Sequence, residues 1–240
     1  MNGITVWMAF VDAIPVAVFL LAALQLIRDF GEEIQGGSSK GLTDFLFVSS
    51  GCLMLFGGAL LKLGWKFLYA LNVCDYDTLS ESFFPMQTIG FAMFGMGVLG
   101  HLCQRERTAR FAYSIFGGVI GLAFLAITWM FTSGAKAEAI LEVNQVLPYE
   151  SHMPFLLCTF LGFMVTLVAL ILLGVRRKAK LWPLAFLVCM IFFIVQAVAG
   201  SMFDGSSVMH WVAQCANIVA QSGLLAGAYG IYRYKHISDR

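Results

Sequence analysis

Charged residues are scarce in this sequence. They make up 12% of the 240 residues, whereas hydrophobic residues make up 60%, and the mean hydropathy is +0.82. A soluble domain typically carries about 25% charged residues. A soluble protein with half that charge would expose a large apolar surface and aggregate. The shortage of charge therefore excludes an ordinary soluble domain and favours a chain whose surface meets lipid.

Motifs for metals, cofactors and nucleic acid are also missing. The four histidines form no HxxxH or HExxH pattern, and none of the six cysteines forms a Cys-x-x-Cys pair. These absences argue against a metal site and a disulfide framework. No glycine-rich loop precedes a Lys-Ser/Thr pair, and no basic run is interleaved with aromatic residues, as a nucleic-acid site would need. We expect no metal, no cofactor, no nucleic-acid partner and no catalytic site.

Long apolar runs are what the sequence has in abundance. Roughly 20 apolar residues in a helix cross the hydrocarbon core, and lipid supplies no hydrogen bonds to an unpaired backbone. Strand-like alternation is absent, so each run is predicted to be a helix. The sequence predicts an all-α integral membrane protein in which residues 1–240 form a single seven-helix domain. The predicted spans lie near 5–27, 43–66, 84–103, 111–132, 154–175, 181–203 and 207–232. No basic residue precedes the first run, so we expect a retained helix rather than a cleaved signal.

Lysine and arginine give the bundle a predicted direction. Twelve of the fifteen lie in the odd-numbered connections and the C-terminal tail, and only Lys62, Lys66 and Lys136 lie elsewhere. The positive-inside rule places the richer set in the cytoplasm. The N-terminus is therefore predicted outside and the C-terminus inside. Short loops and the lack of an Asn-x-Ser/Thr sequence indicate a multi-pass cell membrane protein of a bacterial inner membrane.

Two small-xxx-small pairs mark expected helix contacts. Gly117 and Gly121 form the first pair, and Gly223 and Gly227 form the second. This spacing lets helix backbones approach closely. Packing inside the bundle is the favoured interpretation, and a dimer interface is the alternative.

The last run carries a stripe of polar side chains. His210, Gln214, Asn217 and Gln221 are spaced by 4, 3 and 4 residues, which places them on one face of a helix. Polar groups facing lipid are costly, so the stripe is expected to face the bundle interior. It either contacts a ligand or forms an interhelical hydrogen-bond network.

With this topology, nearly all polar groups of the other spans fall in their outer halves, while the inner halves are mostly apolar. The pattern predicts an outward-facing polar cavity. Asp12 needs a partner there, because an isolated buried carboxylate is strongly disfavoured. By depth Lys62 is the best candidate, and His210 or a bound cation could serve instead. The predicted ligand-binding residues are Asp12, Lys62, Gln87, Trp129, Gln196, His210, Gln214, Asn217 and Gln221.

The favoured function is binding or transport of a small molecule or ion at the outer face. A sensory seven-helix module is the alternative. It would act through a cytoplasmic protein partner docked on the basic inner loops, although those loops could equally contact anionic lipid. An intramembrane enzyme with Asp12 or His210 as acid or base is the third hypothesis. The lipid bilayer is the one partner that all three share.

Overall fold

The fold is known from a computed structural model, which describes residues 5–34, 39–75, 79–80, 82–103, 153–201 and 207–238. This part of the chain consists of long α-helices joined by turns. The helices are α1 (Val6–Ile34), α2 (Ser39–Ala70), α4 (Phe83–Leu102), α6 (Met153–Arg176), α7 (Pro183–Ser201) and α8 (Ser207–Ser238).

The helices α1 and α2, both apolar enough to cross a membrane, are longer than a membrane is thick. They contain 29 and 32 residues, and at 1.5 Å per residue α1 alone is roughly 43 Å long. The hydrocarbon core measures only about 30 Å. Their ends therefore reach past the apolar layer, where charged side chains are tolerated.

Two of the helices end in the same kind of turn. After α2, Asn72 adopts a left-handed conformation (φ 54°) and the Val73 N–H donates to the Leu68 carbonyl at 3.0 Å. After α6, Lys178 does the same (φ 55°) and the Ala179 N–H donates to the Gly174 carbonyl at 3.0 Å. These bonds satisfy carbonyls that a helix end would leave unpaired. Both turns fix the direction in which the chain leaves its helix.

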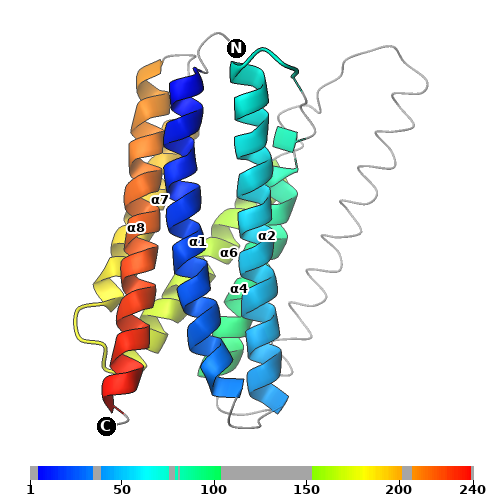
Figure 1. Ribbon diagram of the computed structural model, residues 1–240. Helices are drawn as coiled ribbons and strands as arrows, with labels where there is room; N and C mark the ends of the chain where they lie inside the picture. Colours follow the sequence, from blue (N-terminus) through cyan, green and yellow to red (C-terminus); the bar gives the residue numbers. More distant parts are fainter. Residues whose placement is uncertain are drawn as a thin grey trace.

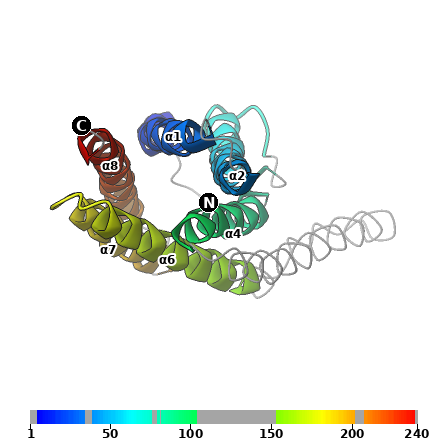
Figure 2. The same ribbon diagram turned by 90° about the horizontal axis from the view of Figure 1, so that it is seen from below.

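The six helices stand side by side in a closed ring. Going round it, the order is α1, α2, α4, α6, α7, α8 and back to α1 (Figure 2). The start of α1 and the finish of α8 lie at opposite ends of the bundle (Figure 1). We call the end where α1 begins the Asp12 end and the end where α1 finishes the Asp29 end. The ring brings the first and last helices of the chain into contact.

Neighbouring helices in this ring are not all antiparallel. Thr88 on α4 lies beside Thr159 on α6, and Leu102 further along α4 lies beside Arg176 further along α6. These two helices therefore run in the same direction. Leu102 and Met153 consequently lie at opposite ends of the bundle. The predicted span 111–132 falls between them and lies outside the described residues.

The ring is filled by one hydrophobic core to which all six helices contribute, with side chains such as Phe30, Leu55, Phe94, Leu167 and Ile231 almost fully buried. Glycines allow the tightest contacts. A Cβ on Gly51 of α2 would lie 2.5 Å from the backbone nitrogen of Phe94 on α4. Close backbone approach of this kind is how membrane helices gain packing energy.

The pair Gly223 and Gly227 packs α8 against α7. A Cβ on Gly223 would lie 2.7 Å from the Ala185 carbonyl oxygen, and one on Gly227 would lie 2.6 Å from the Phe186 ring. The packing interpretation of this pair is confirmed, since both glycines face a helix of the same bundle. Gly117 and Gly121 lie outside the described residues.

The outward faces of the helices are apolar. Leu53 on α2 is 70% exposed, and similarly exposed leucine, isoleucine and valine side chains cover α1, α6 and α7. Four described helices are long and apolar enough to cross a membrane: Val6–Glu32, Gly41–Ala70, Phe83–Leu102 and Cys158–Arg176. A shorter apolar helix covers Pro183–Ala199. A surface of this kind is stable in lipid and not in water. The chain is therefore a helical membrane protein.

Six of the seven predicted spans coincide with a helix of this bundle. The largest boundary difference within them is at α1, which continues to Ile34, seven residues past the predicted end at 27. Pro15 does not interrupt this helix. The total number of spans stays a prediction.

Candidate functional site

The chain buries charged groups at both ends of the bundle. At the Asp12 end these are Asp12, Lys62, Lys66 and His210, which we call the Asp12 cluster. At the Asp29 end, Asp29 is surrounded by cations from other segments. Charged groups within membrane helices are costly and mark functional positions by default, so both clusters are candidates.

Asp12 on α1 forms an ion pair with Lys66 on α2. Both residues are buried, at 7% and 8% exposure. The expectation that Lys62 would pair with Asp12 is therefore wrong. Lys62 and Lys66 are one turn apart and have similar depths, but the rotation of α2 against α1 brings the later lysine to the carboxylate. Phe10 and Phe67, whose ring centroids are 5.1 Å apart, pack across the same two helices nearby.

Lys62 instead contacts aromatic rings of α4. Its Nζ atom lies 4.2 Å from the centroid of Phe83 and 5.4 Å from that of Phe84. A cation over the face of an aromatic ring is attracted by the ring quadrupole. Asp12 remains within electrostatic range of this second lysine. The cluster thus sets two lysines of α2 around one carboxylate.

His210 brings α8 to this cluster, where it interacts electrostatically with Lys66, Asp12 and Lys62. The stripe that begins at His210 faces away from the surrounding medium. Gln214 is buried, and His210, Asn217 and Gln221 are half-buried. Exposed side chains cover the other faces of this part of α8: Val208, Trp211, Val212, Cys215, Val219 and Ser222.

Two hydrogen bonds hold carboxamides in place near these charges. The Gln87 Nε2 atom donates to the Leu55 carbonyl at 2.9 Å, joining α4 to α2. The Gln221 Nε2 atom donates to the Asn217 side-chain oxygen at 3.3 Å. Among the described residues, the Gln196 and Gln221 side-chain oxygens are buried and have no hydrogen-bond partner. Both are therefore acceptors that still need a donor.

Sequence reasoning missed the group at the opposite end. Asp29 is 1% exposed, and its carboxylate accepts hydrogen bonds from Arg177 at 2.5 Å and Lys235 at 3.3 Å. Lys235 also donates to the Asp29 backbone carbonyl at 2.9 Å. We call Asp29, Arg177 and Lys235 the Asp29 cluster. It joins α1 to α8 and to the α6–α7 connection.

The α6 turn explains how Arg177 reaches Asp29. Arg177 directly precedes Lys178, whose left-handed backbone reverses the chain. Beside this contact, the Tyr232 hydroxyl donates to the Glu32 carboxylate at 2.9 Å, and Arg28 lies over the Tyr232 ring. A second buried carboxylate, Asp44 of α2, lies 4.0 Å from His101 of α4. The halves of the helices at the Asp29 end thus carry more buried polar groups than their apolar sequence predicts.

The sequence shows the charge of Asp29 but not the partners that bury it. Asp29 lies next to Arg28 and two residues past the predicted end of the first span, in a predicted loop. Hydropathy marks where a helix crosses the apolar layer and not where it stops. A buried partner 206 residues away, as Lys235 is, leaves no local pattern.

The remaining predicted site residue, Trp129, lies outside the described residues. Trp7 is 76% exposed and Trp211 is 39% exposed, as expected for side chains at a membrane interface. Trp65 is buried and donates from its Nε1 atom to Asp75 at 2.9 Å. Within the described part of the chain, no three His, Cys, Asp or Glu side chains come together as a metal site requires.

The fold and its buried charges define the class of the protein as helical and membrane-embedded. Searches for relatives add no narrower class, because no family model, curated protein or solved structure matches the chain.

Proposed function

We propose that this chain is a seven-span membrane protein, with its N-terminus outside, that binds a small anionic solute at the Asp12 cluster. The observation that carries the proposal is the ratio of charges. Among the described residues, two lysines of α2 gather around a single carboxylate, and the imidazole of His210 on α8 lies within electrostatic range of them. Lys66 is matched by Asp12, and Lys62 rests on aromatic rings.

An incoming carboxylate or phosphate is the counter-ion that such a group favours. A buried ammonium lowers its free energy most when a negative charge with hydrogen-bond acceptors comes within reach. Phe83 and Phe84 hold Lys62 in place without neutralising it. The Asp12–Lys66 pair keeps the rest of the cluster neutral. The solute's anionic group is then bound between α2, α4 and α8.

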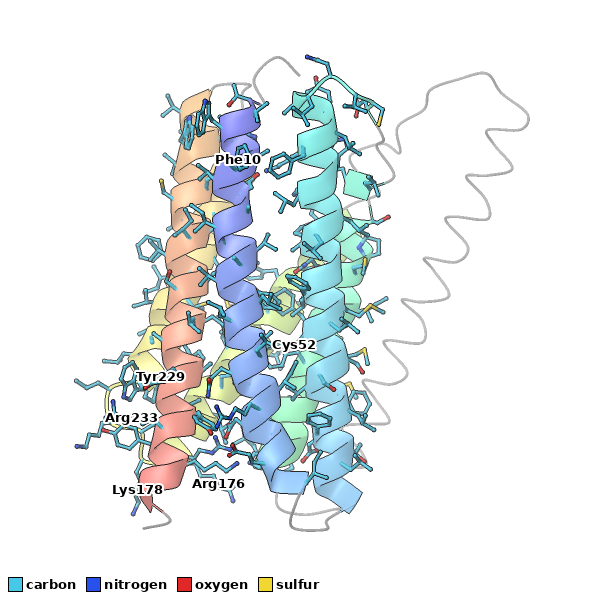
Figure 3. All side chains as sticks on the ribbon, viewed as in Figure 1. Phe10, Cys52, Arg176, Lys178, Tyr229 and Arg233 are labelled. Atoms are coloured by element: carbon cyan, nitrogen blue, oxygen red, sulfur yellow. The ribbon has the colours of Figure 1, made fainter. Side chains whose placement is uncertain are left out.

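The orientation that we propose for the chain in the membrane follows from exposed basic residues at the Asp29 end. Arg176, Lys178 and Arg233 are exposed where α8 finishes (Figure 3). Lys180 is exposed in the same connection. Such residues favour the cytoplasmic side. The Asp12 end would then open to the outside of a bacterial inner membrane.

The test is the thermal stability of the purified chain in nanodiscs of neutral lipid. A ligand that binds only the folded state raises the melting temperature with its concentration. Acetate, glutamate and phosphate are the anionic probes, and choline and sodium, as chloride salts, are the cationic ones. We expect at least one anion class to raise the melting temperature in a saturable manner, and the cations not to.

Two variants separate a site from a general salt effect. Lys62→Met should abolish the saturable part of the shift. Lys178→Gln removes one exposed lysine at the far end and should leave it intact. Phosphate also stabilises proteins by exclusion from their surface, and that part should be equal in both variants. Equal shifts in both variants for every anion, or saturable binding of a cation alone, would overturn the proposal.

The exposed basic residues at the Asp29 end also favour a second candidate, in which a cytoplasmic protein or anionic lipid docks there. Anionic headgroups attract basic side chains near the surface. Purification from native membranes distinguishes the two. Recovery of the chain alone, with anionic lipid, would exclude the signalling role through a protein partner.

A further inference from the structure

One face of α8 runs from the Asp12 cluster to the Asp29 cluster. The stripe His210, Gln214, Asn217 and Gln221 continues at the same helical spacing to Tyr232 and Lys235. Those last two residues bind Glu32 and Asp29 of α1. Lys235 is 25 residues after His210, which is almost a whole number of turns at 3.6 residues each. The two buried charge clusters are therefore connected along a single helix face.

Carboxamides at the middle of this face have unfilled hydrogen-bonding capacity. The side-chain oxygens of Gln196 and Gln221 are buried and have no hydrogen-bond partner in the part of the chain that the structure describes. The contacts Phe186–Gly227 and Cys189–Gly223 show that α7 is antiparallel to α8. Seven residues after Cys189, Gln196 reaches the level of Ala216 and Asn217 on the same face of α7. Gln196 thus lies on the α8 side of α7 at the level of Asn217. Gln221 lies one turn further along α8, on the face that carries the stripe and is turned away from Gly223 and Gly227. We call this stretch of the bundle interior beside α8 the seam.

Acceptors of this kind require an explanation inside a membrane bundle. Buried polar atoms are nearly always paired with protein or with ordered water, and lipid supplies no donor. None of the described side chains donates to Gln196 or Gln221, which favours water or a polar solute as the donor. Nearer the Asp29 end, the Gln25 Nε2 atom is a buried donor that likewise lacks a partner. Gln25 lies one turn before Asp29 on α1.

The Asp29 cluster closes the far end of this face. Asp29 is almost completely buried, and its two cations come from α8 and from the α6–α7 connection. Between Gln221 and Tyr232 the seam is lined by Leu224, Leu225 and Ala228, which belong to or pack on the hydrophobic core. The described conformation is therefore polar from the Asp12 end to the middle and sealed beyond it.

We propose that the Asp12 site opens into a hydrated solute path along α8, closed at the Asp29 cluster, so that the chain transports its anion instead of only binding it. This inference rests on the proposed function. Breaking the contacts of Asp29 frees α1 from α8 and from the α6–α7 connection together. Opening one end while the other is closed is the general requirement for transport around a central site.

Water access along the seam is tested without knowledge of the solute. An impermeant methanethiosulfonate carrying a sulfonate reacts with thiolates, which form only in hydrated surroundings. The reagent is added to the outside of vesicles containing Gln221→Cys. Ser222→Cys is the matched control, since Ser222 is one residue away at the same depth but exposed on the outward face. Labelling of the six native cysteines is measured in the wild type and subtracted.

We expect Gln221→Cys to be modified at least about tenfold faster than Ser222→Cys, because a thiol in lipid stays protonated and unreactive. Equal rates at the two positions would overturn the path. The same result is expected for Gln196→Cys on α7 against Val198→Cys, whose position is 50% exposed. This second pair keeps the test decisive if Gln221→Cys fails to fold.

The seal is tested from the opposite side with Gln25→Cys in inside-out vesicles. Modification should be slow in the otherwise unaltered chain and at least about tenfold faster with Lys235→Met, which removes one of the two cations from Asp29. Leu24→Cys, on the exposed face of α1, should react equally slowly in both backgrounds. No change at Gln25→Cys would refute the gate.

The two proposals fail in different ways. Saturable stabilisation by an anion, with unreactive thiols at Gln221 and Gln196, leaves the binding site and removes the path. Reactive thiols without stabilisation by any anion leave a hydrated path and remove the anion site.

Discussion

Asp12 and Asp29 are buried in the same helix, but their partners differ in origin. The partner of Asp12 is Lys66 of the next helix, and Lys62 stands one turn away on the same helix. The partners of Asp29 come from two distant parts of the chain, Arg177 and Lys235. Among the described residues, the Asp12 cluster therefore has one more lysine than carboxylate, whereas the carboxylate of Asp29 is bound by two cations. A second lysine favours a ligand-binding site, and a carboxylate that is bound by two cations favours a closed end of the bundle.

The comparison predicts that Asp29→Asn destabilises the chain more than any other single substitution in the two clusters. The substitution leaves Arg177 and Lys235 buried without a carboxylate, and breaking a buried pair costs roughly 3–5 kcal/mol. Unfolding of the purified chain in mixed micelles measures the loss. Asp12→Asn should cost less, because Asp12 binds one cation where Asp29 binds two and is itself more exposed, at 7% against 1%. Adding Lys235→Met to Asp29→Asn should recover part of the stability. A larger loss for Asp12→Asn would reverse the assignment of the two clusters.

The second lysine near Asp12 predicts that the stability losses caused by removing Lys62 and Lys66 are not additive. Lys66→Met alone should have a modest effect, because Lys62 is within electrostatic range of Asp12 and can take over. Removing both lysines should cost about 1–3 kcal/mol more than the sum of the single losses. The same unfolding assay applied to the four chains of a double-mutant cycle measures this difference. Additive stability losses would mean that Lys62 does not stabilise the carboxylate of Asp12.

The packing of α2 against α4, between the Asp12 end and the Asp29 end, should be sensitive to the addition of one methyl group. Gly51→Ala places a Cβ 2.5 Å from the backbone of α4, and overpacking of this kind costs about 1–3 kcal/mol. Gly64→Ala is the control on the same helix, because nothing lies within 4 Å of its Cβ position. Midpoints of thermal unfolding compare the two. Equal stabilities would show that α2 and α4 can move apart freely.

The smallest effect is expected for a neutral hydrogen bond near the Asp12 end. Thr88→Val removes the 2.8 Å bond between the Thr88 and Thr159 hydroxyls that joins α4 to α6. Side-chain hydrogen bonds between membrane helices average about 0.6 kcal/mol. The expected loss is therefore a fraction of that for either aspartate, in the same micelle assay. A loss as large as that of Asp12→Asn would show that charge is not what distinguishes this end.

The sequence is sufficient to locate helices but not to choose ion-pair partners. Apolar runs predict the positions of all six described helices, because the thickness of the lipid sets their length. The stripe on α8 is visible because its members lie on one helix. Lys62 and Lys66 share a face, so depth alone does not distinguish them. The rotation of α2 about its axis is fixed by packing, as where Gly51 of α2 and Gly97 of α4 meet the facing helix, and the sequence does not show it.

The Asp29 cluster lies beyond sequence reasoning for a different reason. Its two cations are 148 and 206 residues away from Asp29 in the chain. Only the closed ring of helices brings the three residues together, and the order of helices around that ring is not encoded in hydropathy. The predicted outer site therefore includes the polar residues near the Asp12 end but omits the second group of buried polar residues, at the Asp29 end.

The closed ring also sets the order in which the two aspartates find their partners during synthesis. Lys66 follows Asp12 by 54 residues, whereas Lys235 follows Asp29 by 206. At about 5–20 residues per second, Asp12 can pair within roughly 3–11 s, whereas Asp29 waits roughly 7–30 s for Arg177 and 10–40 s for Lys235. Until Arg177 is made, the carboxylate at the end of the first helix lacks both of the cations that bind it in the folded chain. A chain that stops before α8 is complete leaves α1 without Lys235, the last of these contacts to form.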